Sequence, residues 1–251
     1  FREFERASTT VVNAYVTPVL DAYIGRLQSE LPGNVRRLRV MQSNGGTISA
    51  SEARITGVKS IVSGPAGGVV GALSVSQMSG NNQIITLDMG GTSTDVSLIQ
   101  GDPKITSQSV VGGVPIRIPM IDIHTVGAGG GSIAYVDAGG ALKVGPKSAG
   151  AHPGPACYGL GGDYPTVTDA NIVLGRIRPE HFLGGKMNID ETRADNVLTQ
   201  LAERAKLAKR TALTMAQSAA LGIVEVTNAH MERALRLISV QRGYDPRDFT
   251  L

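Results

Sequence analysis

One stretch of fourteen residues, "TLDMGGTSTDVSLI" from Thr86 to Ile99, constrains the fold more than any other part of the sequence. The apolar stretches 83–87 and 96–99 are typical of β-strands, and the polar residues between them have the length of a tight hairpin. Gly90 and Gly91 allow the backbone of such a hairpin to approach a ligand without a Cβ in the way. The sequence therefore predicts a hairpin that is a candidate cradle for phosphate.

The side chains around the two glycines suit the same ligand. Thr92, Ser93 and Thr94 offer hydroxyl donors beside backbone amides that can converge on an anion. Asp88 and Asp95 are candidates to hold Mg²⁺, usually through water, or to orient an attacking group. An ordinary hairpin, in which these residues serve only the turn, is the alternative that the pattern leaves open.

Composition excludes several other classes of function. The net charge is +3, and no window is dominated by Lys and Arg, so nucleic acid is not expected as a partner. No stretch approaches the ~20 apolar residues that cross a membrane, so no membrane-spanning segment is expected. The single Cys157 cannot form an internal disulfide, which favours the reducing cytoplasm.

Helices are predicted on both sides of a central region rich in glycine and proline. Apolar spacing indicates a helix over 11–27, restarted at Pro18 with Thr17 as its cap, and another over 63–80 with Ser63 as a possible cap. We expect helices again from Asp190 onward. Short strands are predicted over 38–41, 116–123 and 133–136. The organisation predicted is 1–82 leading to the hairpin, 83–185 holding the hairpin and the candidate active-site region, and 186–251 helical.

Three further side chains are candidate metal ligands. Asp122 and His124 are two residues apart, so on one strand both would point to the same face. His152 follows in "AHPGPACYG". Three such ligands suit Zn²⁺, Mn²⁺ or Fe²⁺ with an open coordination position, and a surface Asp beside two hydrogen-bonded histidines is the alternative.

Other reactive residues have simpler interpretations. Cys157 is expected to be a small buried hydrophobe rather than a nucleophile. Asp169 is expected to cap a helix. The glycine run 127–131 is either an anion cradle or a flexible turn. His230 is expected on a helix face, and the nearby arginines, Arg233, Arg236 and Arg242, on a solvated face or in ion pairs.

Seven motifs in the same order resemble the hydantoinase A and 5-oxoprolinase family, and the hairpin resembles the second phosphate motif of the actin, Hsp70 and sugar kinase superfamily. Together they run through nearly the whole chain, which makes the resemblance specific. The motifs are "MQSNGG", "SGPAGGVVGA", "DMGGTSTDVSLI", "DIHTVGAGGGSIAYVD", "AHPGPACYG", "TVTDANIVLGRI" and "RGYDPRDFTL".

The resemblance implies an α/β fold of the actin-like ATPase type, with mixed sheets, flanking helices and an incomplete two-lobed architecture. It implies that ATP and Mg²⁺ activate the carbonyl of a cyclic amide for ring opening. Carried onto this sequence, it makes Gly90, Gly91, Thr92, Ser93 and Thr94 the phosphate contacts. Asp88 and Asp95 then become the catalytic candidates.

Two other functions remain open beside the cyclic-amide hydrolase. One is the ATP-hydrolysing subunit of a ketone carboxylase, and the other is a non-catalytic nucleotide-binding module. The resemblance also implies a second subunit or domain of the hydantoinase B type, and an oligomer.

The two ends of the sequence suggest a central portion of a longer protein. The start "FREFERAST" has no initiating Met, and the final residues "FTL" resemble the beginning of a strand. The family's first phosphate hairpin would lie before Phe1, and its adenine-side glycine motif would lie after Leu251. We therefore expect the 251 residues alone to turn over little ATP.

Overall fold

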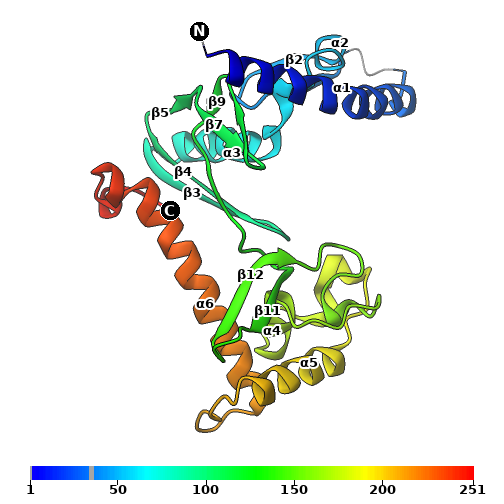
Figure 1. The fold of residues 1–251 in the computed structure, drawn as a ribbon, viewed down its shortest axis with the longest axis vertical. Helices are drawn as coiled ribbons and strands as arrows, with labels where there is room; N and C mark the ends of the chain where they lie inside the picture. The colour runs from blue at the N-terminus through cyan, green and yellow to red at the C-terminus, as the bar shows by residue number, and fades with distance from the viewer. Residues whose placement is uncertain (1, 34–36) are drawn as a thin grey trace. The chain divides into compact units, whose positions relative to one another are not determined.

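A computed structural model describes residues 2–33 and 37–251 of the chain, and Figure 1 shows their helices and strands. The chain divides into two compact units. Unit 1 comprises 1–86, 97–123 and 245–251, and unit 2 comprises 87–96 and 124–244. The predicted segments were continuous in sequence, whereas each unit combines residues from separate stretches. Within the described ranges, no helix is both long and apolar enough to cross a membrane.

Unit 1 contains three α-helices and a set of short antiparallel strand pairs among the described residues. The helices are α1 (Glu3–Glu30), α2 (Ala50–Ala53) and α3 (Ser63–Met78), with 3₁₀ turns at Gly57–Ser60 and Pro246–Asp248. The pairs are β1 (Arg39–Met41) with β2 (Thr47–Ser49), β6 (Ile105–Thr106) with β9 (Met120–Ile121), and β7 (Ser109–Val111) with β8 (Val114–Ile116).

The N-terminal helix differs from its prediction. It continues through Pro18 without a restart. Thr17 does not cap a second helix, because its hydroxyl accepts a hydrogen bond from the Gly57 amide at 3.2 Å. Ser63 is the first residue of α3, and the capping position is Val62, which has no side-chain acceptor. At Thr17, therefore, a tertiary contact uses the hydroxyl that was predicted to cap a second helix.

The predicted hairpin belongs to a four-stranded sheet. Its strands are β3 (Gln83–Met89) and β4 (Thr94–Gln100), and the strand order is β10-β4-β3, with β5 (Asp102–Pro103) also paired to β4. Both β10 and β5 run antiparallel to β4. A parallel bridge joins Ile84 to Thr250, and the Ile85 amide donates to the Thr250 carbonyl at 2.8 Å. The final "FTL" therefore adds an extended segment beside β3.

The strand predicted over 116–123 is wrong, because the chain changes partners at this point. β9 pairs with β6 in unit 1, whereas β10 (His124–Val126) pairs with β4 in unit 2. Asp122 lies between the two strands, and its amide donates to the Lys104 carbonyl at 2.8 Å. The alternation rule that put Asp122 and His124 on one face therefore does not apply.

Unit 2 packs a β-hairpin against helices. β11 (Ser132–Val136) pairs with β12 (Leu142–Ser148), and the helices are α4 (Val167–Val173), α5 (Glu191–Arg204) and α6 (Met215–Ile238). Shorter 3₁₀ turns lie at Ala156–Tyr158, Pro179–Gly185 and Val240–Arg242. Thr214 and Gln217 form a capping box that begins α6.

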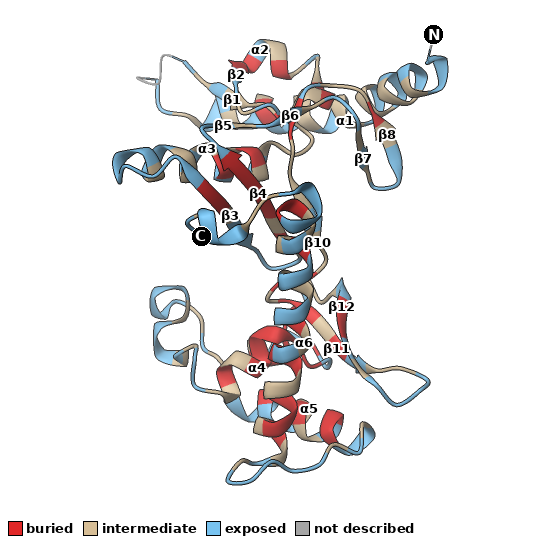
Figure 2. Ribbon diagram, turned by 90° about the vertical axis from the view of Figure 1, so that its left-hand side faces the viewer, coloured by how far each residue is buried: buried red, intermediate tan, exposed pale blue. Residues whose placement is uncertain are grey.

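The core of unit 2 is rich in alanine. Figure 2 shows buried residues concentrated on α4, α5 and the part of α6 beside them. Small side chains let the helices approach closely, and Leu198 and Ile223 fill the remaining space with no exposed surface. Members of this core include Ala134, Val144, Val167, Ala170, Leu201, Ala202, Ala216, Ala219, Ala220 and Val224. This core supports β11 and β12, which follow the glycine run beside the hairpin tip.

Candidate functional site

The tip of the β3–β4 hairpin, residues 90–93, is held closed by one backbone hydrogen bond. The Gly90 amide donates to the Ser93 carbonyl at 2.8 Å. The amides of Gly91, Thr92 and Ser93 donate to no residue in the ranges that the structure describes. Successive unpaired amides in a turn are the backbone feature that binds anions. The tip therefore has the donors that a phosphate cradle requires.

A second glycine segment packs against this tip. Gly130 donates from its amide to the Gly90 carbonyl at 3.0 Å, and Gly131 donates to the Gly91 carbonyl at 2.7 Å. A Cβ on Gly129 would lie 2.7 Å from the backbone nitrogens of both Thr92 and Ser93. The run "GAGGG" is therefore neither a free loop nor a separate anion site here, because its backbone fixes the carbonyls of the tip.

The two tip glycines have a different environment. Apart from its chain neighbours, no described residue has an atom within 4 Å of a Cβ placed on Gly91, and a Cβ on Gly90 would meet, among those residues, only the Ser93 carbonyl oxygen at 3.6 Å. Neither residue has a positive φ that would require glycine. Steric contacts within the described chain therefore leave room for a side chain at Gly91, and a ligand that approaches the backbone would use that room.

Thr94 does not have the predicted role of a phosphate donor in this structure. Its side chain is fully buried, and its hydroxyl donates to the Ala128 carbonyl at 2.5 Å. Since a hydroxyl has one proton to donate, Thr94 ties the hairpin to the glycine run instead. Thr92 is exposed and Ser93 is half-buried, so both remain available as donors.

The two aspartates of the hairpin differ in exposure and partners. Asp88 lies near the end of β3 and is exposed. Asp95 is half-buried on β4, and its carboxylate accepts a hydrogen bond from the Thr125 hydroxyl at 2.5 Å. Thr125 is its register partner on β10. The sequence pattern gave no sign of Thr125, because the contact depends on the pairing of β10 with β4.

The predicted metal ligands occupy separate positions. Asp122 belongs to unit 1, while His124 and His152 belong to unit 2. Among the residues that the structure describes, no group of three or more His, Cys, Asp or Glu side chains is arranged to hold a metal ion. His152 is exposed in a loop, and His124 is half-buried on β10. The assignment of these three residues to a metal remains a prediction.

Cys157 and Asp169 form a buried structural pair. The Asp169 carboxylate accepts hydrogen bonds from the Cys157 amide at 2.8 Å, the Thr166 amide at 2.9 Å and the Thr166 hydroxyl at 2.7 Å. Asp169 is the third residue of α4 and completes a capping box whose N-cap is Thr166, so it caps the helix from within rather than from the position before it that was predicted. Burial, and then the negative charge of Asp169, raise the pKa of the Cys157 thiol far above its usual range. A protonated thiol is a poor nucleophile.

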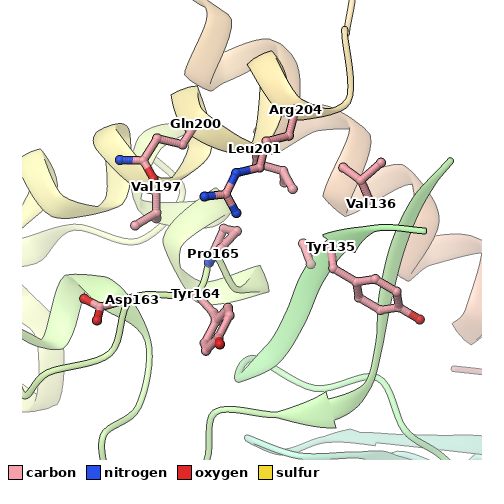
Figure 3. Close-up of a pocket in the computed structure, with 10 residues that line it drawn as sticks. Tyr135, Val136, Asp163, Tyr164, Pro165, Val197, Gln200, Leu201 and Arg204 are labelled. Carbon is pink, nitrogen blue, oxygen red and sulfur yellow. The ribbon is translucent and has the colours of Figure 1, made fainter. Parts of the chain in front are cut away.

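Unit 2 also contains two cavities whose described lining residues do not include any residue of the hairpin. One measures about 460 Å³ and is lined by residues of β11, α5 and the loop before α4. Figure 3 shows the Arg204 side chain extending from α5 toward Pro165 in this cavity. The other measures about 470 Å³ and includes His124 and His230 in its lining.

The small sheets with their helices and the glycine-packed hairpin together define an α/β protein with a candidate anion-binding hairpin. A family described as hydantoinase/oxoprolinase matches residues 6–251, and the chain belongs to that family. The caprolactamase subunit alpha of Pseudomonas jessenii is 44% identical over 253 residues, which cover 100% of this chain and 36% of the relative.

Solved structures similar to the chain include two enzymes. Nucleotide-free acetone carboxylase superposes with a TM-score of 0.86 at 31% identity, over 99% of this chain and 34% of that one. The ATP-dependent caprolactamase of Pseudomonas jessenii superposes with a TM-score of 0.75 at 42% identity, over 99% of this chain and 36% of that one. The chain therefore spans about a third of the length of these relatives. The resemblance to the hydantoinase A and 5-oxoprolinase family, which the seven motifs predicted, is confirmed.

Proposed function

We propose that this chain supplies a phosphate-binding hairpin to an ATP-dependent enzyme that opens cyclic amides. The observation that carries the proposal is the hairpin tip, where three unpaired amides adjoin two glycines that the protein's own packing does not require. The names of the relatives support it, since one is an ATP-dependent caprolactamase and the family is named for hydantoinase and oxoprolinase.

The residues present fit a nucleotide with Mg²⁺. The amides of Gly91, Thr92 and Ser93 would bind phosphate oxygens, and the hydroxyls of Thr92 and Ser93 would add donors. The exposed Asp88 carboxylate is the type of ligand that Mg²⁺ prefers, directly or through water. The Thr125 hydroxyl would hold the Asp95 carboxylate in a fixed orientation beside them. Bound ATP would supply a phosphoryl group that activates the amide oxygen for ring opening.

The proposed fold is the actin-like ATPase type. The antiparallel order β10-β4-β3, followed by a parallel bridge between Ile84 and Thr250, supports a mixed sheet of that kind. Other parts of a longer protein, together with a hydantoinase B-type partner, would complete the nucleotide site and supply the substrate site.

A second candidate is the ATP-hydrolysing subunit of a ketone carboxylase. The observation in its favour is the higher TM-score with acetone carboxylase, 0.86 against 0.75, despite lower sequence identity. Both candidates use the same hairpin, so they differ in the compound that stimulates ATP cleavage.

The test measures ADP release by the full-length protein with its partner subunit, in the presence of cyclic amides or of ketone plus bicarbonate. Stimulation by a cyclic amide supports the first function, and stimulation only by ketone plus bicarbonate supports the second. Asp88→Ala should abolish turnover without loss of folding, because Asp88 is exposed. Asp102→Ala, an exposed aspartate on β5, is the matched control. Normal kcat in Asp88→Ala would contradict its assigned role.

A further inference from the structure

The cavity of about 470 Å³ lies between α6, β10 and β12, entirely within unit 2. Small-molecule pockets typically measure ~300–1,000 Å³, so this cavity can hold a compact ligand. Its α6 face consists of His230, Arg233, Ala234 and Leu237. These residues are spaced by three and four positions, as expected for one face of a helix.

Basic groups from three different elements converge on the cavity. His230 and Arg233 come from α6, His124 from β10 and Lys143 from β12. No Asp or Glu occurs among the described residues that line it. Lys143 is partly neutralised, because its Nζ lies 3.7 Å from Asp137 Oδ2. Within the described chain Arg233 has no ion-pair partner, whereas Arg236 is paired with Glu232.

The cavity is on the other side of β10 from the hairpin carboxylate. Thr125 points toward Asp95, as their hydrogen bond requires. Side chains alternate along a strand, so His124 and Val126 point to the opposite face, and both line the cavity. The cavity is therefore separate from the groups that the proposed nucleotide site uses.

We infer that this cavity binds a small aliphatic carboxylate. A guanidinium pairs with a carboxylate through two parallel N–H···O bonds, which makes Arg233 the principal contact. The imidazoles of His124 and His230 flank the same anionic group. Val126, Val144 and Leu237 provide the apolar surface for the ligand's hydrocarbon part. Inorganic phosphate has no such part, so it should bind more weakly than a carboxylate of a few carbons.

The experiment is a ligand-observed NMR titration of the full-length protein with butyrate and, separately, with inorganic phosphate. Butyrate should bind saturably, and Arg233→Gln should weaken its affinity at least tenfold. His230→Gln should weaken it in the same direction. Arg236→Gln is the matched control, because this arginine is on the same helix, outside the cavity and paired with Glu232. It should leave the affinity within twofold.

Three results would overturn the inference: no saturable butyrate binding, equal losses in Arg233→Gln and Arg236→Gln, or phosphate binding that Arg233→Gln weakens and that is tighter than butyrate binding. Phosphate binding that Arg233→Gln leaves unchanged belongs to the hairpin. Arg233 is exposed, so its replacement should not prevent folding, and thermal unfolding of each variant checks this. Asp88→Ala should leave butyrate binding unchanged, which separates this site from the proposed nucleotide site.

Discussion

Gly129 lies so close to Thr92 that a Cβ on Gly129 would stand 2.7 Å from the Thr92 backbone nitrogen, a distance that real Cβ atoms essentially never show. The nearby atoms are backbone, so they cannot rotate away as a flexible side chain would. This contact sets the position of the hairpin tip relative to the glycine run. Packing therefore requires a glycine at position 129, whereas it does not require one at position 91.

Gly129→Ala should therefore displace the tip and lower ATP turnover of the full-length enzyme. Misplacement of a reacting group by about 1 Å can cost ~10²-fold in rate, so we expect a loss of at least tenfold in kcat. Steady-state ADP release measures it. The melting temperature should fall as well, because the hydrogen bonds that the Gly130 and Gly131 amides donate to the carbonyls of the tip must lengthen.

Gly91→Val provides the opposite case. A Cβ at this position meets no atom of the described residues within 4 Å, its chain neighbours aside, so the melting temperature should change little. Turnover should nevertheless be lost, because the branched side chain blocks the approach of phosphate to the backbone. Normal kcat in Gly91→Val would show that the tip does not hold phosphate, and the ordinary hairpin would then be the better interpretation.

The β3–β4 hairpin was predictable because its signals are local. Alternating apolar stretches and a glycine pair identify the strands and the turn, and the structure places them within two residues of the predicted bounds. The buried role of Thr94 was not predictable, since it depends on the Ala128 carbonyl, which is 34 positions away in sequence. This long-range contact determines which of the three neighbouring hydroxyls is buried.

The metal prediction shows the same limitation. Asp122 and His124 satisfy the spacing of one strand, but β9 and β10 join different partners, and the break falls between them. Strand pairing is a long-range property that a two-residue spacing cannot reveal. The cavity formed by His124, His230 and Arg233 was missed for the same reason, because α6 and β10 are about a hundred positions apart.

Thr125→Val should impair catalysis if Asp95 acts in the site. The substitution preserves the shape of the side chain but removes the hydroxyl that donates to the carboxylate. A hydrogen bond to a charged group contributes about 1.5–3 kcal/mol, which corresponds to a roughly tenfold or greater loss in kcat/KM if the bond positions the carboxylate in the transition state. Thr125→Ser retains the hydroxyl and should restore most of the activity. Equal kinetics in all three proteins would mean that this contact has no catalytic role.

Leu198→Ala tests the alanine-rich core of unit 2. Leu198 is fully buried among small side chains that cannot expand to fill the space it leaves. The free energy of unfolding should decrease by about 2–5 kcal/mol, as for other buried Leu→Ala changes. Chemical denaturation measures the change. Leu160→Ala, at a leucine that is 49% exposed, should cost much less. Equal costs would contradict the packing described for α5.

Cys157 should be unreactive in the folded protein. Its side chain has no exposed surface, and burial together with the Asp169 charge raises the pKa of the thiol. The thiolate is the nucleophilic form, and a raised pKa means that it does not accumulate as the pH increases from 7 to 9. Iodoacetamide should therefore fail to label the folded chain across this range. Labelling should become rapid once denaturant exposes the residue.

The matching kinetic test is Cys157→Ala in the full-length enzyme. Alanine keeps the small apolar character of the site. It also keeps the hydrogen bond that the backbone amide of residue 157 donates to the Asp169 carboxylate. If Cys157 only fills space, kcat and KM should both stay within about twofold of the unmodified enzyme. A nucleophilic role would instead remove nearly all turnover, because a covalent intermediate cannot form without the sulfur. Loss of activity with an unchanged melting temperature would therefore overturn the structural role, and so would rapid labelling of the folded protein at pH 8.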